Sequence, residues 1–166
     1  MKWHGFGMFG MGGAGTDPAE SGFSQRVAQL GINIHGSPYN DYDCANIAKI
    51  IDGLPPEDGI FVWGTSLGSN DTPVVCGYTK HRIDGAFGFQ ASIYGVHSSL
   101  TSNVKFAHLI SSNNPVPFPG LGAYIWQPGT IDVSCYHRTQ HDIPHPGDYD
   151  AHDQNIFLHE MKEIMG

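Results

Sequence analysis

A serine between two glycines follows a short apolar segment of the chain. The stretch FVWGTSLGSND, residues 61–71, places Ser66 between Gly64 and Gly68. Where a strand turns sharply into a helix, neighbours of little bulk let the side chain at the turn project outward. A hydroxyl there could attack a carbonyl carbon if a base accepts its proton and amides hold the oxyanion. The pattern predicts a nucleophilic serine; the alternative is a glycine-rich turn with a hydrogen-bonded serine.

The segments on either side of Ser66 are those that such a turn requires. Residues 59–64 form a continuous apolar run, typical of a parallel strand that is covered on both faces. A helix is predicted over residues 69–80, with Pro73 in its first turn or just beyond, where a missing N–H costs little. The sequence thus predicts a strand, a tight turn and a helix in direct succession.

Backbone amides close to the serine are expected to hold the oxyanion. The N–H of Leu67 stands at the helix start, where free amides and the helix dipole favour negative charge. A second donor is expected from Gly10, in the glycine-rich loop after the first strand. Gly5, Gly7 and Gly10 also match a phosphate-binding spacing, but no Gly-Lys-Ser/Thr follows them. We therefore reject a phosphate site.

The remaining pattern predicts a single α/β domain over residues 1–166. This length suffices for one core and is too short for two domains of ordinary size. One helix is expected to have Asp41 or Asp43 as its N-cap and to end at Gly53. Strands that alternate with helices imply a mostly parallel sheet of five to six strands in three layers. The other predicted strands are 3–9, 32–35, 87–94, 104–110 and 131–136, and the other predicted helices are 23–30 and 154–165.

Composition restricts the partners and the compartment. The net charge of −8, with eight scattered Lys and Arg, would repel phosphate backbones, so no nucleic-acid partner is expected. The three cysteines are widely spaced without a CxxC pair, which favours a reducing, cytoplasmic location. No apolar run reaches the roughly 20 residues of a membrane span, and no signal-peptide pattern begins the chain.

The order of elements and the Gly-Thr-Ser-Leu-Gly turn resemble the α/β-hydrolase superfamily in its small, lidless, lipase- and cutinase-like form. The resemblance covers nearly the whole chain, although the first strands of that family are missing. It implies a minimal hydrolase fold without a cap domain and a serine esterase that forms an acyl-enzyme on Ser66. It implies no cofactor and no metal.

The resemblance also implies an acid after the second strand beyond the serine. In LISSNNPVPFPG, residues 109–120, the family's acid position before Pro-Val-Pro is Asn114. Asparagine can orient an imidazole but cannot offset the charge of an imidazolium. Asn114 can equally be a turn former before a proline. Asp142 and Asp150 are the reserve candidates for the acid, and each can also be a capping or solvated loop residue.

The base of that family lies in a loop just before the final helix. This position selects His152, in the stretch YDAHDQNIF. His141 and His145 are the reserves, because they follow the predicted last strand as well.

Two alternatives of other classes remain open. His137, His141 and His145 recur every four residues and, with nearby carboxylates, could bind zinc or manganese in a metal-dependent hydrolase or a metal-binding domain. Pro144 and Pro146 argue against the helix that would align them. The second alternative is an inactive binding domain that keeps a hydrolase scaffold, which the asparagine at the acid position favours.

The expected substrates are small or surface-presented esters in a shallow, open site. Phe9, Met11, Phe118 and Leu121 are the candidate substrate contacts, and aromatic residues of this kind equally often pack against a sheet. A truncated sheet leaves edge strands that a homodimer could cover.

Overall fold

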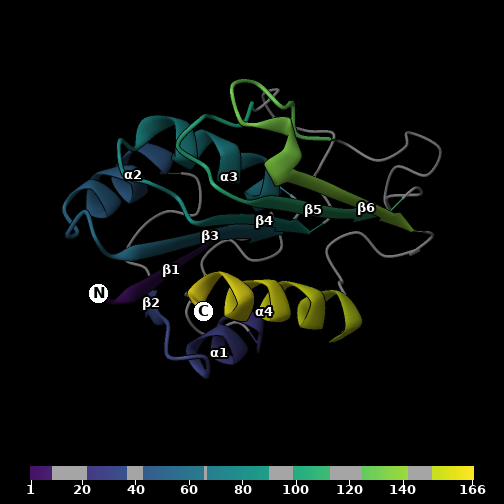
Figure 1. Ribbon diagram of the computed structural model, residues 1–166, viewed down its shortest axis with the longest axis horizontal. Helices are drawn as coiled ribbons and strands as arrows, with labels where there is room; N and C mark the ends of the chain where they lie inside the picture. The colour runs from purple at the N-terminus through teal and green to yellow at the C-terminus, as the bar shows by residue number, and fades with distance from the viewer. Residues whose placement is uncertain (9–21, 37–42, 66, 90–98, 113–124, 142–150) are drawn as a thin grey trace.

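A six-stranded parallel sheet forms the centre of the computed structural model, which describes residues 1–8, 22–36, 43–65, 67–89, 99–112, 125–141 and 151–166 (Figure 1). The strand order is β2-β1-β3-β4-β5-β6. The strands are β1 Trp3–Met8, β2 Asn33–His35, β3 Gly59–Thr65, β4 Gly85–Phe89, β5 Ala107–Ser112 and β6 Tyr136–His141. The helices are α1 Gly22–Ala28, α2 Cys44–Asp52, α3 Leu67–Tyr78 and α4 Ala151–Met165, with a 3-10 turn, η3, over Val133–Cys135.

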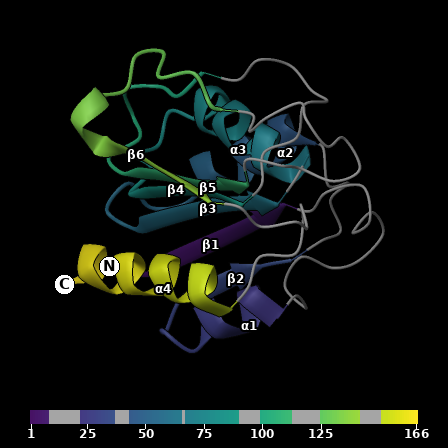
Figure 2. The same ribbon diagram turned by 90° about the vertical axis from the view of Figure 1, so that its right-hand side faces the viewer.

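The helices cover both faces of the sheet. Helices α2 and α3 lie on one face and α1 and α4 on the other, as Figures 1 and 2 show from two directions. All five strand pairs are parallel. The predicted three-layer α/β fold with a parallel sheet is therefore confirmed. In the described part of the chain, no helix is long and apolar enough to cross a membrane.

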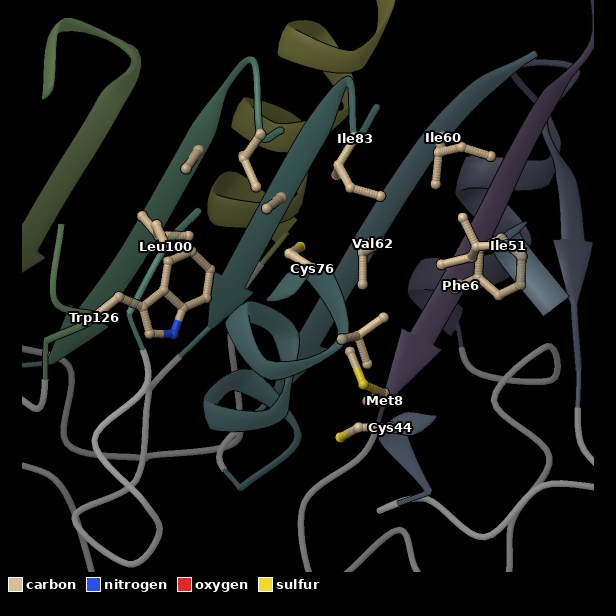
Figure 3. Close-up of a cluster of buried hydrophobic side chains, with 14 of the residues drawn as sticks. Phe6, Met8, Cys44, Ile51, Ile60, Val62, Cys76, Ile83, Leu100 and Trp126 are labelled. Carbon is tan, nitrogen blue, oxygen red and sulfur yellow. The ribbon is translucent and has the colours of Figure 1, made fainter. Parts of the chain in front are cut away.

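The central strand β3 supplies both halves of the core through the alternation of its side chains. Ile60 and Val62 join the cluster on the side of α2 and α3, where Figure 3 shows them among aliphatic and sulfur-containing side chains. Phe61 and Trp63 join the cluster on the side of α1 and α4, which is rich in aromatic rings. Gly7 of β1 leaves room for Trp63, because a Cβ there would lie 2.6 Å from the indole nitrogen.

The ends of α2 follow from its sequence as predicted. Asp43 is the N-cap, and its Oδ1 accepts a hydrogen bond from the N–H of Asn46 at 3.2 Å. Gly53 follows the last helical residue, and its N–H donates to carbonyls of the final turn. The helix therefore begins and ends where local capping chemistry directs it.

The predicted last strand over residues 131–136 is wrong. Asp132 caps the 3-10 turn η3 by accepting hydrogen bonds from Ser134, and the strand begins only at Tyr136. Ile131 is buried as part of a loop instead. The apolar residues before position 136 suggested a strand, whereas β6 is largely polar because it lies at the edge of the sheet.

Helix α3 begins two residues earlier than predicted, so Pro73 lies in its interior. Proline lacks an N–H, which leaves the carbonyl of Ser69, four residues earlier, without its helical donor. The indole Nε1–H of Trp126 donates to that carbonyl at 2.8 Å. The Tyr136 hydroxyl in turn donates to the carbonyl of Trp126 at 2.9 Å. Trp126 thus repairs the helix and ties it to the loop before β6.

The contribution of the hydrogen bond from Trp126 to the Ser69 carbonyl can be measured as a change in the free energy of unfolding. Trp126→Phe keeps an aromatic ring and removes the indole N–H, so the buried Ser69 carbonyl loses its donor. We expect the free energy of unfolding to fall by about 1 to 3 kcal/mol in urea titrations. Trp3→Phe is the control, since Trp3 is only half-buried, and its loss should be smaller. Equal losses in the two variants would contradict this role of Trp126.

Candidate functional site

The carboxyl ends of the parallel strands meet at one edge of the sheet, and the helices that follow them begin there. From β1 the chain passes through α1 to β2, and from β3 it passes through α3 to β4, in the opposite direction along the sheet. Helices α1 and α3 lie on opposite faces (Figure 2). Neighbouring strands whose connections diverge in this way form the switch point at which open α/β sheets bind ligands. The carboxyl edge between β1 and β3 is therefore the candidate site.

The turn at this edge is shorter than predicted, because the sequence placed the end of the strand at Gly64 and the start of the helix at Ser69. Strand β3 ends at Thr65 and α3 begins at Leu67, so a single residue, Ser66, connects them. A Cβ at Gly64 would lie 2.1 Å from the carbonyl oxygen of Gly68, so the first turn of α3 packs directly on the strand backbone. The first N–H groups of α3 have no partner within the helix and face this edge. They are suited to hold an oxyanion beside the turn.

The first half of α3 buries polar side chains, although a helix that only packs on a sheet buries mainly apolar ones. Ser69 and Thr72 are fully buried, and the Thr72 hydroxyl donates to the Gly68 carbonyl at 3.2 Å. Among the described residues, the Ser69 hydroxyl and the Asp71 Oδ2 atom have no hydrogen-bond partner although both are buried. Buried polar atoms without partners reduce stability, which is typical of functional sites.

Asp71 is a carboxyl group at this edge whose pKa is raised. Burial raises the pKa of Asp71 to about 6, against a smaller opposing effect of the neighbouring Cys44 thiol. Burial likewise raises the pKa of the Cys44 thiol to about 12, with the Asp71 carboxylate adding to the rise. A thiol with so high a pKa stays protonated at neutral pH, so Cys44 is not a thiolate nucleophile.

Most of the predicted site residues follow β1, β5 or β6 along the chain. Leu67 is the first residue of α3, as the oxyanion role requires. His152 was expected in a loop, but it lies in the first turn of α4 with an exposed side chain. The others lie outside the described residues: Ser66, Phe9, Gly10, Met11, Asn114, Phe118, Leu121, Asp142, His145 and Asp150.

The histidines proposed as metal ligands lie on a strand. His137 and His141 belong to β6, where four residues span about 13 Å. The helical rise of about 6 Å over four residues, which would align these two positions as predicted, is therefore absent. The described residues contain no group of three or more histidine, cysteine or carboxylate side chains that could hold a metal ion.

Sequence reasoning missed two polar groupings. Asp71 lies in the quoted stretch, but its raised pKa depends on burial beside α2, which no local pattern reveals. His108 contacts Glu160 and Thr139, which are 52 and 31 residues away along the chain, so no spacing could signal the contact.

Comparisons of the chain with protein-family models, with curated proteins and with solved structures find no match. No family is therefore assigned, and function must be argued from the fold and the geometry of the carboxyl edge.

The packing of the turn predicts a strong effect of a single methyl group. In Gly64→Ala the new Cβ would overlap the Gly68 carbonyl, and backbone atoms must move. We expect a loss of about 2 to 3 kcal/mol in the free energy of unfolding, measured in urea. Gly22→Ala is the control, because a Cβ at this helical glycine meets no atom within 4 Å. A Gly64→Ala protein as stable as Gly22→Ala would refute the tight packing.

The raised pKa of Asp71 predicts a pH-dependent cost. The folded protein binds the carboxyl proton more tightly than the unfolded chain, so stability falls as the pH rises from about 4 to about 6 and stays lower above that. Asp71→Asn should therefore raise the free energy of unfolding at pH 7 by about 1 kcal/mol, allowing for solvent screening at a half-buried group. At pH 4 the gain should nearly disappear.

Asp132→Asn provides the opposite control for this measurement. Hydrogen bonds from Ser134 lower the pKa of Asp132, so removal of its charge should not stabilise the protein at pH 7. A gain at Asp71 that does not depend on pH would contradict the argument.

Proposed function

We propose that this protein is a carboxylic ester hydrolase with Ser66 as its nucleophile. The observation that carries the proposal is the turn from β3 to α3 through one residue, with the backbone of Gly68 against Gly64. The turn stands at the switch point of the sheet, beside free amides of a helix start. Strand, single serine and helix in this arrangement are what an exposed nucleophilic hydroxyl requires.

The proposed reaction has two halves. The Ser66 hydroxyl attacks the ester carbonyl, a histidine accepts its proton, and the N–H groups of Leu67 and of Gly10 hold the oxyanion. The intermediate collapses to an acyl-enzyme and the alcohol leaves with the proton from the histidine. Water that the same histidine activates then releases the acid. No cofactor or metal takes part in these steps.

The order of elements supports the proposed partners of the serine. Asn114 follows β5, and His152 follows β6 at the start of α4, so both segments begin at the edge that holds the turn. His152 is solvent-exposed, as a base that serves an open site can be. Asp142 and Asp150 remain candidates for the acid, and His141 and His145 remain candidates for the base.

The length of the connections supports small or surface-presented esters as substrates. Residues 90–106 and 113–135 join β4, β5 and β6, and each connection is too short to form a separate cap domain. The candidate contacts to the acyl or alcohol group are Phe9, Met11, Phe118 and Leu121. The metal-dependent alternative loses support because β6 separates His137 from His141.

A fluorophosphonate probe tests the nucleophile directly. We expect one adduct in mass spectrometry on the tryptic peptide 50–80, which contains Ser66, and no adduct on that peptide in Ser66→Ala. Turnover of p-nitrophenyl butyrate through this site should fall about 10³-fold or more in Ser66→Ala. Ser134→Ala is the matched control, since Ser134 is an exposed serine bonded only to its neighbours.

The base is tested in the same assay. His152→Ala should abolish turnover through Ser66. His81→Ala should retain it if the protein folds, since His81 is bonded to two backbone carbonyls. Full labelling of peptide 50–80 in Ser66→Ala, or no labelling of folded wild-type protein on that peptide, would overturn the assignment of Ser66.

A further inference from the structure

A pocket of about 600 Å³ lies between α4 and the strands β5 and β6. Its wall includes His108 of β5, Thr139 of β6 and Glu160 of α4, together with Phe106 and Arg138. Phe106 directly precedes β5, and the others lie in β5, in β6 and in the second half of α4, whereas the turn after β3 lies at the carboxyl edge. We call it the β5–β6–α4 pocket. Its volume is in the range of small-molecule sites.

A chain of two hydrogen bonds crosses the wall of this pocket. Nδ1 of His108 lies 2.6 Å from Oε1 of Glu160, and Nε2 of His108 lies 2.8 Å from Oγ1 of Thr139. The His108 side chain is 7% exposed and that of Glu160 is 21% exposed. The chain therefore joins a carboxylate, an imidazole and a hydroxyl from three separate elements in a largely dehydrated setting.

The direction of each hydrogen bond follows from the groups themselves. An ionised carboxylate only accepts, so Glu160 fixes the proton of a neutral His108 on Nδ1. Nε2 then carries a lone pair and must accept, so the Thr139 hydroxyl donates to it. The hydroxyl proton points at a base, and the oxygen lone pairs of Thr139 are left for the pocket. This is the arrangement by which a base activates a hydroxyl nucleophile.

The rest of the wall indicates the shape of a ligand. The ring of His137 stacks on Phe106, with centroids 5.0 Å apart and planes at 29°. Both residues line the pocket and offer flat surface to an aromatic group. Arg138 lines the same pocket as well.

We propose that Thr139 is a second nucleophilic hydroxyl, activated by His108, which accepts the acyl group of a small aryl ester bound in the β5–β6–α4 pocket. Oγ1 of Thr139 bonds to the carbonyl carbon while its proton moves to Nε2 of His108. The bond from that carbon to the phenolic oxygen breaks, and the phenolate takes the proton from His108. The products are a phenol and a Thr139 ester, and attack by water along the same path restores the threonine.

This proposal does not depend on Ser66, and the experiment keeps the two sites apart. The full chain carrying Ser66→Ala is treated with p-nitrophenyl acetate, and tryptic peptides are analysed by mass spectrometry. Trypsin cuts after Arg138, so Thr139 begins the peptide 139–162, which is separate from the peptide 50–80. We expect acetyl on Thr139 by fragmentation of the peptide 139–162, whatever the outcome at Ser66.

Variants of the nucleophile decide between reactivity and a purely structural contact. In the Ser66→Ala background, Thr139→Ser should keep the acetylation and Thr139→Val should abolish it at that position. Thr130→Val is the matched control, since Thr130 is an exposed threonine that accepts only a backbone N–H from Ser102. No acetyl at position 139 in the folded Ser66→Ala protein, or none in Thr139→Ser, would overturn the proposal.

Variants of the partners test the activation. His108→Gln should slow acetylation of Thr139 by about 100-fold or more, the range for loss of a general base. Glu160 is a positioning residue, so Glu160→Gln should lower kcat for p-nitrophenyl acetate and leave KM unchanged. Acetylation at the wild-type rate in folded His108→Gln would also overturn the proposal. If His108→Gln does not fold, the Thr139→Ser and Thr139→Val pair decides alone.

Discussion

The direct contact between the backbones of Gly64 and Gly68 is the constraint on which the rest of the structure depends. Any side chain at Gly64 would overlap the first turn of α3. Because the two backbones touch, the chain reverses from β3 into α3 through one residue. The start of α3 and its first N–H groups are therefore fixed at the carboxyl edge of the central strand.

Glycines also make room for large aromatic side chains on the two faces of the sheet. Glycines of β1 leave space for Trp63, and Gly88 of β4 leaves space for Trp126, since a Cβ there would lie 2.3 Å from its ring. On the face toward α4, the ring of Phe157 lies 5.0 Å from that of Phe87 and 4.4 Å from that of Phe89. Aromatic packing of this kind fixes where α4 crosses the sheet, and hence where its first turn, which contains His152, lies.

Polar groups in this protein gather where elements meet rather than within one element. At the carboxyl edge, Asp71 has an unpartnered oxygen and a raised pKa, which reduce stability at a place suited to chemistry. Between β5, β6 and α4, His108 has partners on both ring nitrogens. Both groupings keep a buried carboxylate oxygen without a hydrogen-bond partner, Oδ2 of Asp71 in the first and Oε2 of Glu160 in the second.

The sequence by itself determined the class of fold and the location of the central turn. A continuous apolar run predicted β3, and helical periodicity predicted α1 and α4. Both patterns follow directly from whether an element is buried on one face or on two. Asp43 and Gly53 marked the ends of α2 because capping is local chemistry. The serine between small residues marked the turn for the same reason.

Only the tertiary structure decided the strand at the edge, the repair of α3 and the environment of the polar groups. Strand β6 is polar because one side has no neighbouring strand, so apolar patterning misplaced it. Trp126 satisfies the carbonyl that Pro73 leaves free, across 57 residues of sequence from Ser69. The contacts of His108 likewise join residues 52 and 31 positions apart. Local patterns record propensity and burial, but hydrogen bonds and pKa values depend on partners that only the folded chain brings together.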